Sequence, residues 1–464
     1  MPADKNLGCV LTTRSEYGIL VKDQLDKAFT QIQEPEAVHI FEKTVAAIDD
    51  ALAFGEENKA LPSKVSDYIR CLATVGKARI PRIRALLKMH KPVVSARLIV
   101  ASTALVTTPA AIYVASILQI IVASFLEVAS ATSDVIDLVQ KYQPGGDDFM
   151  HTFDVDNMYP SLDQSVLVHS VRTVLIAYYS NKPEPAWGAR VEFIILLVQL
   201  ILSAQVCKWS ARSGQSISYW RQHIGVSTGL ACGSQFANCY LRALDLSITS
   251  SFRSIRVYTR YIDDILIISS IDILQALLVA FNSFDEYISI SHDPEEDCKR
   301  VSFLDLDLQL LPASICFRTF RKPLATFNYL PFQSCHSMLT KQAIVHTELI
   351  RVLRTCSTEQ AFEEEARLTL SKFRDRGYDI MLIRSVAAKV TWSATEFHVK
   401  SNLAKPKIVP FKFRFSQYAE KLGLSNLIRE AATNLPSDFV KSHKIVVCYL
   451  TGRSLFRQRY TRFF

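Results

Sequence analysis

The stretch TRYIDDILIISS (residues 259–270) places two acids, Asp263 and Asp264, side by side within a run rich in apolar residues. The flanks, SIRVYTRY and ILIISS, are rich in β-branched and aromatic side chains. They predict a strand, a tight turn and a second strand, with the acids at the turn. Asp is common in ordinary polar turns. Two adjacent carboxylates beside a buried strand nevertheless repel each other and lose hydration, so a compensating partner is expected.

A second acidic motif lies in HTFDVDNMYPSL (residues 151–162), where Asp154 ends an apolar strand and Asp156 follows two residues later. Phosphoryl transfer to a growing nucleic-acid strand uses two divalent ions roughly 4 Å apart, held mainly by carboxylates. Asp154 together with Asp263 and Asp264 would supply these carboxylates on rigid strands. Bound Mg²⁺, or Mn²⁺ in its place, would offset the repulsion within the acid pair.

The composition is that of a globular protein with a basic surface. The chain of 464 residues is long enough for two or three domains, and 49% hydrophobic with 21% charged residues argues against disorder. A net charge of +8 favours a polyanionic partner. None of the ten cysteines forms a C-x-x-C pair. We therefore expect reduced thiols in an intracellular protein, nuclear or cytoplasmic, and no zinc or thiol redox motif.

One uncharged segment, residues 98–126, is long enough to cross a membrane. It is interrupted by Pro109 and by threonine, serine and glutamine residues, and it begins as the β-rich run RLIVAS. The pattern favours a strand followed by a buried helix after Pro109, with a membrane span as the alternative. The N-terminal residues lack the apolar run of a signal peptide.

Turn-rich segments divide the rest of the chain. The Pro-Gly-Gly at residues 144–146 separates a mainly helical part from a strand, DFMHTFDV. The NKPEPAWG segment (residues 181–188) interrupts two expected helices, residues 164–179 and 191–206. The predicted parts are residues 1–145, residues 146–320 with a helical insertion near 165–222, and residues 321–464.

Two segments near the C-terminus, KPKIVPFKFRF (residues 405–415) and TGRSLFRQRYTRFF (residues 451–464), interleave cations with aromatic residues and contain no acid. Cations contact phosphates, and aromatic rings stack on bases or pack beneath them. These segments are therefore expected to grip a nucleic-acid duplex.

Together the motifs resemble those of reverse transcriptases. FDVDNMY (residues 153–159) resembles the first palm motif of that family, and RYIDD (residues 260–264) resembles its Tyr-x-Asp-Asp motif. Between them, GVSTGLACGSQFANCYLRALD (residues 225–245) resembles the motif that shapes the template and nucleotide pocket. We name this last segment the pocket motif. The resemblance implies an α+β right-hand polymerase with fingers, a palm of antiparallel sheet backed by helices, and a helical thumb.

The resemblance also implies roles for the matching residues. Asp154, Asp263 and Asp264 would be the catalytic residues and the ligands of two Mg²⁺ ions. Tyr159 would be the aromatic gate that excludes a ribonucleotide 2′-hydroxyl. The pocket motif would act through Gly225, Gly229, Ala237 and Asn238, and Tyr261 would lie beside the nucleotide. The fingers segment LLKMHKPVVSARLIVAS (residues 86–102) would hold the incoming triphosphate through three cations: Lys88, Lys91 and Arg97.

Further stretches are similar to Penelope-like retroelement reverse transcriptases, namely residues 301–308, 321–337 and 373–378. In the first, VSFLDLDL, Asp305 and Asp307 alternate and are expected to face solvent or to cap a turn. The chain departs from that family at Gly233-Ser234, where Ser-Pro is usual, and at Leu98, where Pro is usual. No GIY-YIG endonuclease motif is recognised, so we expect either a fragment or a minimal polymerase without its own nicking activity, with an endonuclease acting in trans as one candidate partner.

The activity implied is extension of a DNA or RNA primer on an RNA template with dNTPs. A palm-type RNA-directed RNA polymerase is an alternative, against which the aromatic residues Tyr159 and Tyr261 argue. A decayed retroelement protein that binds nucleic acid without catalysis is another alternative, which the altered pocket motif leaves open.

Overall fold

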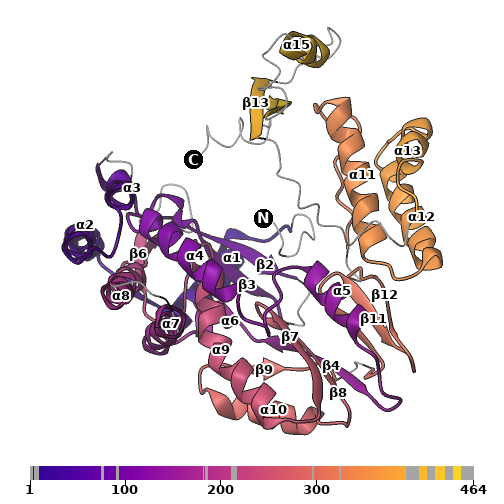
Figure 1. Cartoon of the computed structure of the whole chain (residues 1–464). Helices are drawn as coiled ribbons and strands as arrows, with labels where there is room; N and C mark the ends of the chain where they lie inside the picture. The colour runs from indigo at the N-terminus through magenta and orange to yellow at the C-terminus, as the bar shows by residue number, and fades with distance from the viewer. Residues whose placement is uncertain are drawn as a thin grey trace. The chain divides into compact units, whose positions relative to one another are not determined.

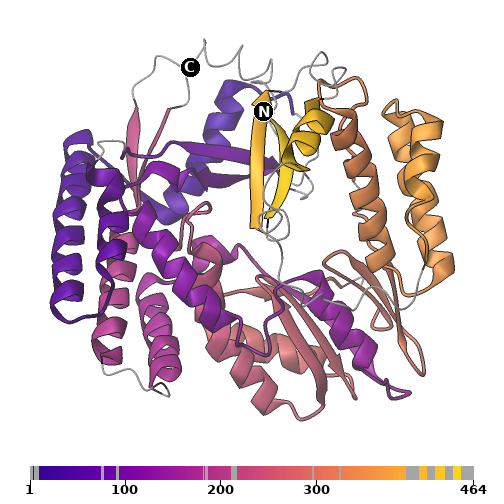
Figure 2. The ribbon, with the colours of Figure 1, turned by 45° about the horizontal axis from the view of Figure 1, so that its top comes forward.

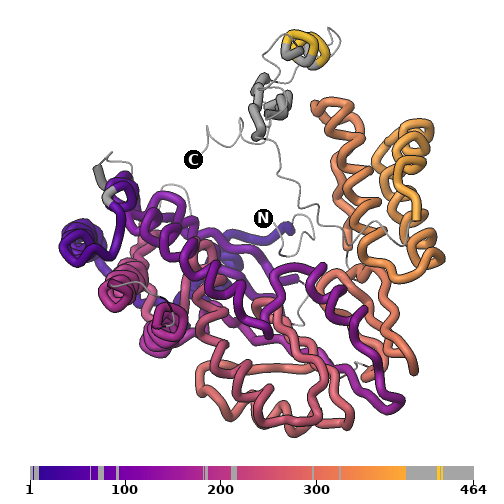
Figure 3. The backbone as a smooth tube through the Cα atoms, in the orientation of Figure 1, coloured from indigo at the N-terminus to yellow at the C-terminus, as the bar shows by residue number. Residues whose placement is uncertain are grey.

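The structure, a computed structural model, describes residues 4, 10–74, 78–89, 93–180, 182, 186–210, 217–294, 297–322, 325–392, 407–414, 424–433 and 443–450 (Figure 3). The chain forms two compact units. Unit one comprises Met1–Ile315 and Phe320–Thr326, and unit two comprises Cys316–Thr319 and Phe327–Phe464 (Figure 1). The expected division of the chain near residue 145 stays a prediction.

The centre of unit one is a four-stranded antiparallel sheet in the order β7-β8-β4-β9. Its strands are β4 (Phe149–Val155), β7 (Ile255–Tyr261), β8 (Asp264–Ser269) and β9 (Ile290–Ser291). The run Ile265 to Ile268 in β8 is fully buried. β-branched residues of this kind favour strands, and here they occupy a central strand, which confirms the predicted strand–turn–strand.

Two helices, α9 (Gly233–Ser251) and α10 (Leu274–Phe284), share one hydrophobic core with this sheet. Phe153 of β4 meets Phe281 of α10 edge to face, with ring centroids 5.0 Å apart. The expected antiparallel sheet backed by helices is therefore present, and Figure 2 shows both helices beside the strands. The α+β class is confirmed.

Further helices of unit one accompany α8 (Trp187–Ser203), which is apolar on nearly every face and packs against α2, α4 and α7. These helices are α1 (Arg14–Ala28), α2 (Glu34–Glu57), α3 (Ser63–Thr74), α4 (Thr108–Val122), α5 (Thr132–Lys141), α6 (Met158–Ser161) and α7 (Gln164–Tyr179). The predicted helix over residues 164–179 coincides with α7.

The uncharged segment over residues 98–126 contains the end of a strand, a short 3-10 turn η2 (Ser102–Ala104) and helix α4, with Pro109 in the first helical turn. The predicted strand and the helix after it are both present. In the described ranges, no helix combines the length and the apolar character that crossing a membrane requires.

Smaller sheets complete unit one. Strands β1 (Phe29–Ile32), β6 (Ser218–Gln222) and β5 (Val206–Trp209) form an antiparallel sheet in that order. The region over residues 165–222, expected to be a helical insertion, thus holds α7 and α8 and then two strands. Two antiparallel pairs follow: β2 (Ile83–Lys88) with β3 (Ser95–Val100), and β10 (Arg300–Phe303) with β11 (Leu306–Leu310). The boundary between the units falls within β12 (Ile315–Thr319).

Unit two begins with three helices, α11 (Met338–Arg354), α12 (Glu359–Asp375) and α13 (Ile380–Ala387). Each starts at a side-chain cap, since Ser337, Thr358 and Asp379 accept hydrogen bonds from the first turns. Farther along lie β13 (Lys407–Arg414), α15 (Leu424–Thr433) and β14 (His443–Leu450), and the two strands pair in parallel.

Candidate active site

Strand pairing brings the two acidic motifs together. In the antiparallel register of β4 and β8, Asp154 lies directly opposite Asp264. The amide of Val155 donates to the carbonyl oxygen of Asp263 at 3.0 Å. Directly opposed residues have Cβ atoms about 4.5–5.5 Å apart and share one face of the sheet. The carboxylates of Asp154 and Asp264 are therefore neighbours, with Asp263 next to them in the turn.

The turn that carries the acid pair is strained. Tyr261 pairs with Asp264, which leaves Ile262 and Asp263 as a two-residue turn. Ile262 has a φ of 58°. This left-handed region costs an L-residue about 1–2 kcal/mol, and a β-branched side chain is rare there. Such strain persists only where the surroundings hold it in place, and it concentrates at functional sites.

A buried arginine holds this turn. Arg260 donates from Nη1 to the carbonyl oxygen of Ile262 and to Oδ1 of Asn238, each at 2.8 Å. Its Nε and Nη2 donate to Oδ1 and Oδ2 of Asp245 at 2.8 and 2.7 Å. Both charged side chains are 0% exposed. Burial works against the charged form, but the Asp245 carboxylate outweighs it and raises the pKa of Arg260 above its ordinary value.

Tyr159, the expected sugar gate, lies half-buried in α6 near the acids. Burial raises the pKa of its phenol, and the negative charge of Asp263 raises it further, followed by Tyr261. A Cβ built on Gly233 would lie 3.5 Å from Cε1 of Tyr159. The residue at which the pocket motif departs from Penelope-like sequences thus packs under the ring of Tyr159.

Two glycines of the pocket motif are required by the backbone. Gly225 has a φ of +74°, and a Cβ there would lie 2.5 Å from the carbonyl oxygen of Pro160. Gly229 has a φ of +114°, and a Cβ there would lie 2.4 Å from the carbonyl oxygen of Val100. Both positions exclude other residues for a steric reason that is independent of any ligand.

Two of the three fingers cations, Lys88 and Arg97, lie on one face of the β2–β3 hairpin. Nζ of Lys88 donates to Oδ1 of Asn157 at 3.1 Å, which brings it to the turn that follows Asp154. Arg97 lies opposite Leu86, and its Nη1 lies 3.5 Å from Oδ1 of Asp4. Paired residues share a face, so Lys88 and Arg97 lie on the same side. Lys91 lies outside the described residues.

Sequence reasoning missed three charged residues near these sites. Arg84 is exposed and lies two residues before Leu86 in β2, so it shares the face of Lys88 and Arg97. The alternation in IRALLK was the available signal. Arg260 and Asp245 were also missed, although both stand inside quoted motifs. A fully buried ion pair is formed by tertiary packing, and the sequence carried no specific sign of it.

Asn238 and Tyr261, both expected to bind the nucleotide, differ in burial. Asn238, expected to bind the nucleotide, is only 8% exposed, and its amide oxygen is used by Arg260. Tyr261 is half-buried at the end of β7, beside the turn. Asp156 follows β4, and its amide donates to the carbonyl oxygen of Ser289 at 2.8 Å.

The donor set near the acids suits magnesium. In the part of the chain that the structure describes, no three side chains of acid, histidine or cysteine type gather closely enough to hold a metal ion by themselves. Mg²⁺ is usually bound through one or two carboxylates, with phosphates and waters completing the octahedron. The facing carboxylates of Asp154 and Asp264, with Asp263 adjacent, fit that requirement.

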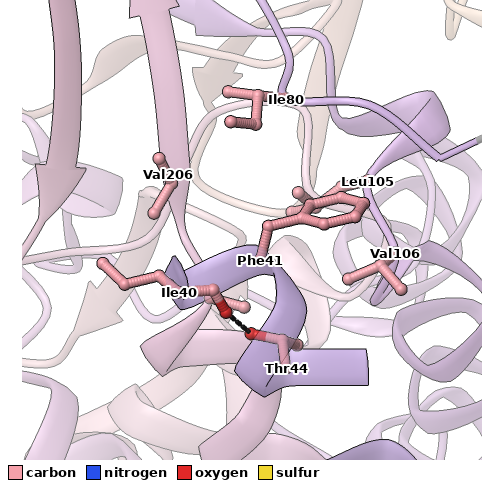
Figure 4. Close-up of a pocket in the computed structure, with 8 residues that line it drawn as sticks. Ile40, Phe41, Thr44, Ile80, Leu105, Val106 and Val206 are labelled. Carbon is pink, nitrogen blue, oxygen red and sulfur yellow. Dashed lines mark hydrogen bonds between the residues drawn. The ribbon is translucent and has the colours of Figure 1, made fainter. Parts of the chain in front are cut away.

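An apolar pocket in unit one offers no comparable chemistry (Figure 4). Its lining has no ionisable group, and its one hydroxyl, that of Thr44, already donates to the carbonyl oxygen of Ile40 at 2.6 Å. The lining residues are Ile40, Phe41, Thr44, Ile80, Leu105, Val106, Ala204 and Val206. We interpret this pocket as space left between packed elements.

A family comparison matches one segment of the chain. The animal helix-turn-helix domain family matches residues 328–386, which include α11, α12 and most of α13. A search of curated proteins with the sequence finds no match.

Solved structures similar to this chain include telomerases and a viral RNA polymerase complex. Telomerase from Candida albicans, in complex with a fragment of telomeric RNA, has a TM-score of 0.49 and 11% identity over 81% of this chain and 64% of its own. Apo telomerase from Candida tropicalis has a TM-score of 0.46 and 13% identity, over 100% of this chain and 68% of its own. An RNA polymerase complex inside a double-stranded RNA virus has a TM-score of 0.40 and 11% identity, over 63% of this chain and 26% of the viral chain. The chain spans less than two thirds of the Candida albicans protein, and none of these TM-scores reaches 0.5.

Proposed function

We propose that this chain is a reverse transcriptase of the Penelope-like type, which extends a DNA or RNA primer on an RNA template with dNTPs. The observation that carries the proposal is the direct pairing of Asp154 with Asp264 on neighbouring strands, with Asp263 in the turn between β7 and β8. Acids from two distant motifs, Asp154 and Asp264, are thus paired at one end of a buried antiparallel sheet, and Asp263 is next to Asp264 in the chain.

In this proposal the three acids hold two Mg²⁺ ions, with Mn²⁺ as a substitute. When bound, the metal supplies charge stabilisation for the transferred phosphoryl group and activates the primer hydroxyl. The protein contributes position: β4 and β8 are hydrogen-bonded to each other, so the carboxylates are set before substrate arrives.

Tyr159 would act as the wall that excludes a 2′-hydroxyl. Its ring is half-buried and packs on Gly233, and the charge of Asp263 reaches its hydroxyl. An aromatic ring fixed in this way cannot yield to an extra oxygen without displacing its support. The same location suits a sugar bound between the acids and the pocket motif.

The cations of the β2–β3 face would bind the triphosphate. Arg97 can grip two phosphate oxygens at once, and Lys88 acts as a point charge beside the Asp154 turn. Arg84 shares the face and adds a third cation. Lys91 keeps its predicted role, although it lies outside the described residues.

Unit two would supply the thumb. The helix-turn-helix match over residues 328–386 is compatible with contact to a nucleic-acid duplex. Of the two cation-aromatic segments, residues 407–414 form β13, and residues 451–464 lie outside the described residues. An endonuclease acting in trans remains part of the proposal as a candidate partner.

The test is primer extension on an RNA template with dNTPs and Mg²⁺, comparing the intact chain with Asp263→Asn/Asp264→Asn. We expect extension by the intact chain and none by the variant, with equal duplex binding. Extension with NTPs in preference to dNTPs would instead indicate an RNA polymerase. Duplex binding without extension by the intact chain would indicate a decayed, nucleic-acid-binding protein.

A further inference from the structure

The guanidinium of Arg260 connects the pocket motif to the turn that carries the acids. Asn238 and Asp245 are seven residues apart in α9, two helical turns, so both lie on the face of the helix toward β7. Arg260 donates to both side chains and to the carbonyl oxygen of Ile262. One fully buried side chain therefore fixes the strained residue that immediately precedes Asp263.

The backbone of Arg260 is held as well. Its amide donates to the carbonyl oxygen of Glu127 at 2.8 Å, and its carbonyl accepts from the amide of Ala129 at 2.9 Å. Glu127 is itself hydrogen-bonded by Arg242 of α9. Helix α9 thus supports Arg260 from its side chain and from its backbone.

Lysine could not replace this arrangement. The planar fork of arginine presents its N–H groups in fixed directions, and here they reach a carboxylate, an amide oxygen and a backbone carbonyl together. An ammonium group keeps the charge that Asp245 requires, but it cannot span the three acceptors. The Ile262 carbonyl and the Asn238 amide oxygen, which share Nη1 of Arg260, would compete for what the lysine can still donate.

We propose that Arg260 is a positioning residue: by clamping the carbonyl of Ile262, it holds Asp263 and Asp264 against Asp154 and thereby sets the affinity of these acids for a divalent cation. The inference rests on the metal site of the proposed function. Residues that orient metal ligands typically change metal affinity or activity by about 10–100-fold when replaced.

The matched control is Tyr258→Phe. Oη of Tyr258 donates to Oδ1 of Asp245 at 2.7 Å, so it belongs to the same buried cluster, but no hydrogen bond joins it to Ile262 or Asn238 among the described contacts. Removal of the Tyr258 hydroxyl should lower the melting temperature without moving the turn. Arg260→Lys should lower the melting temperature and also shift the turn.

The experiment titrates the full chain with Mn²⁺ and follows the free-ion signal by electron paramagnetic resonance, which needs no catalytic activity. Asp263→Asn/Asp264→Asn defines the component of binding that belongs to the acids. For Arg260→Lys we expect the half-saturating Mn²⁺ concentration of that component to rise about 10-fold. For Tyr258→Phe we expect it to stay within about twofold of the parent chain, because a structural defect alone does not change the affinity of the folded fraction.

An Arg260→Lys protein that folds and binds Mn²⁺ as tightly as the parent would overturn the inference, as would a parent chain with no binding dependent on Asp263 and Asp264. If Arg260→Lys does not fold, Asn238→Ala decides, because it keeps the Arg260–Asp245 pair and removes one acceptor. A rise in the half-saturating Mn²⁺ concentration of Asn238→Ala, by a smaller factor than 10-fold, supports the proposal. An unchanged Mn²⁺ affinity of Asn238→Ala refutes it. Primer extension is measured in parallel: a parent chain that binds Mn²⁺ but extends no primer removes the proposed function and leaves this inference standing.

Discussion

Two hairpins of unit one have nearly the same turn and very different surroundings. The β7–β8 turn reads Tyr-Ile-Asp-Asp (residues 261–264), and the β10–β11 turn reads Phe-Leu-Asp-Leu (residues 303–306). Each is a two-residue turn with an apolar residue in the left-handed region, Ile262 at a φ of 58° and Leu304 at 55°. In each turn the next residue is an aspartate.

The hairpins differ in what faces their acids. In β10–β11, Asp307 is bound by Arg300 from the paired strand, with Nε 3.0 Å from Oδ1, near the surface. In β7–β8, the arginine of the hairpin turns inward to Asp245, and Asp264 lies opposite another acid, Asp154. The turn alone therefore does not distinguish the two hairpins; the neighbouring strand and the direction of the arginine do.

The largest expected effect tests the chemistry of the two turns. Asp263→Asn/Asp264→Asn should reduce primer extension by more than about 10²-fold, because charge stabilisation at the reacting phosphate is lost. Asp305→Asn, in the matching turn, should stay within twofold of the parent. Steady-state extension rates measure both. Equal losses would mean that the turns matter only for folding.

The two arginine–aspartate pairs should differ in stability. Asp245→Asn leaves a buried guanidinium without its counter-charge and should lower the free energy of unfolding by about 3–5 kcal/mol. Asp307→Asn breaks a pair near the surface, in which the Arg300 side chain is 58% exposed, and should cost less than about 1 kcal/mol. Urea unfolding of both variants gives the comparison. A small loss for Asp245→Asn would contradict the burial of this pair.

The surroundings of the first turn also predict sugar selection. Tyr159→Ala should reduce discrimination of dNTPs against NTPs by roughly 10–100-fold, since the wall against the 2′-hydroxyl is gone. Gly233→Ala is the control: its Cβ would meet the Tyr159 ring at 3.5 Å, an ordinary contact, so discrimination should hold. Competing dNTP and NTP incorporation measures the ratio, and unchanged discrimination in Tyr159→Ala would exclude the gate.

The smallest effect concerns the turn residues themselves. Glycine accepts a positive φ without strain but adds flexibility. Ile262→Gly should therefore slow primer extension by about tenfold, because the positions of Asp263 and Asp264 become less fixed. Leu304→Gly should change the extension rate less than twofold. Melting temperatures recorded beside the rates separate loss of activity from loss of folding. Equal rates for both variants would contradict a special role for the first turn.

The sequence alone determined the features that depend on neighbouring residues. The apolar run ILII after Asp264 predicted a buried strand, and residues 164–179 predicted a helix, and the structure confirms both. Its start is set locally, since Asp163 accepts from the amides of Ser165 and Val166 at 2.9 Å each. The second helix was predicted for residues 191–206; it starts earlier, at Trp187, and ends at Ser203, where the chain turns into β5. Propensity and patterning do not locate such boundaries.

Tertiary structure alone decided what those elements face. The register that sets Asp154 opposite Asp264, the contact of Gly229 with the Val100 carbonyl, and the inward turn of Arg260 toward Asp245 each join segments far apart in the chain. Motif spacing suggested that the acids belong together, but a one-residue shift of β4 against β8 would have moved Asp154 to the other face of the sheet. Packing of the whole core selects one register, because only that register buries Phe153 and Val155 while leaving Asp154 exposed.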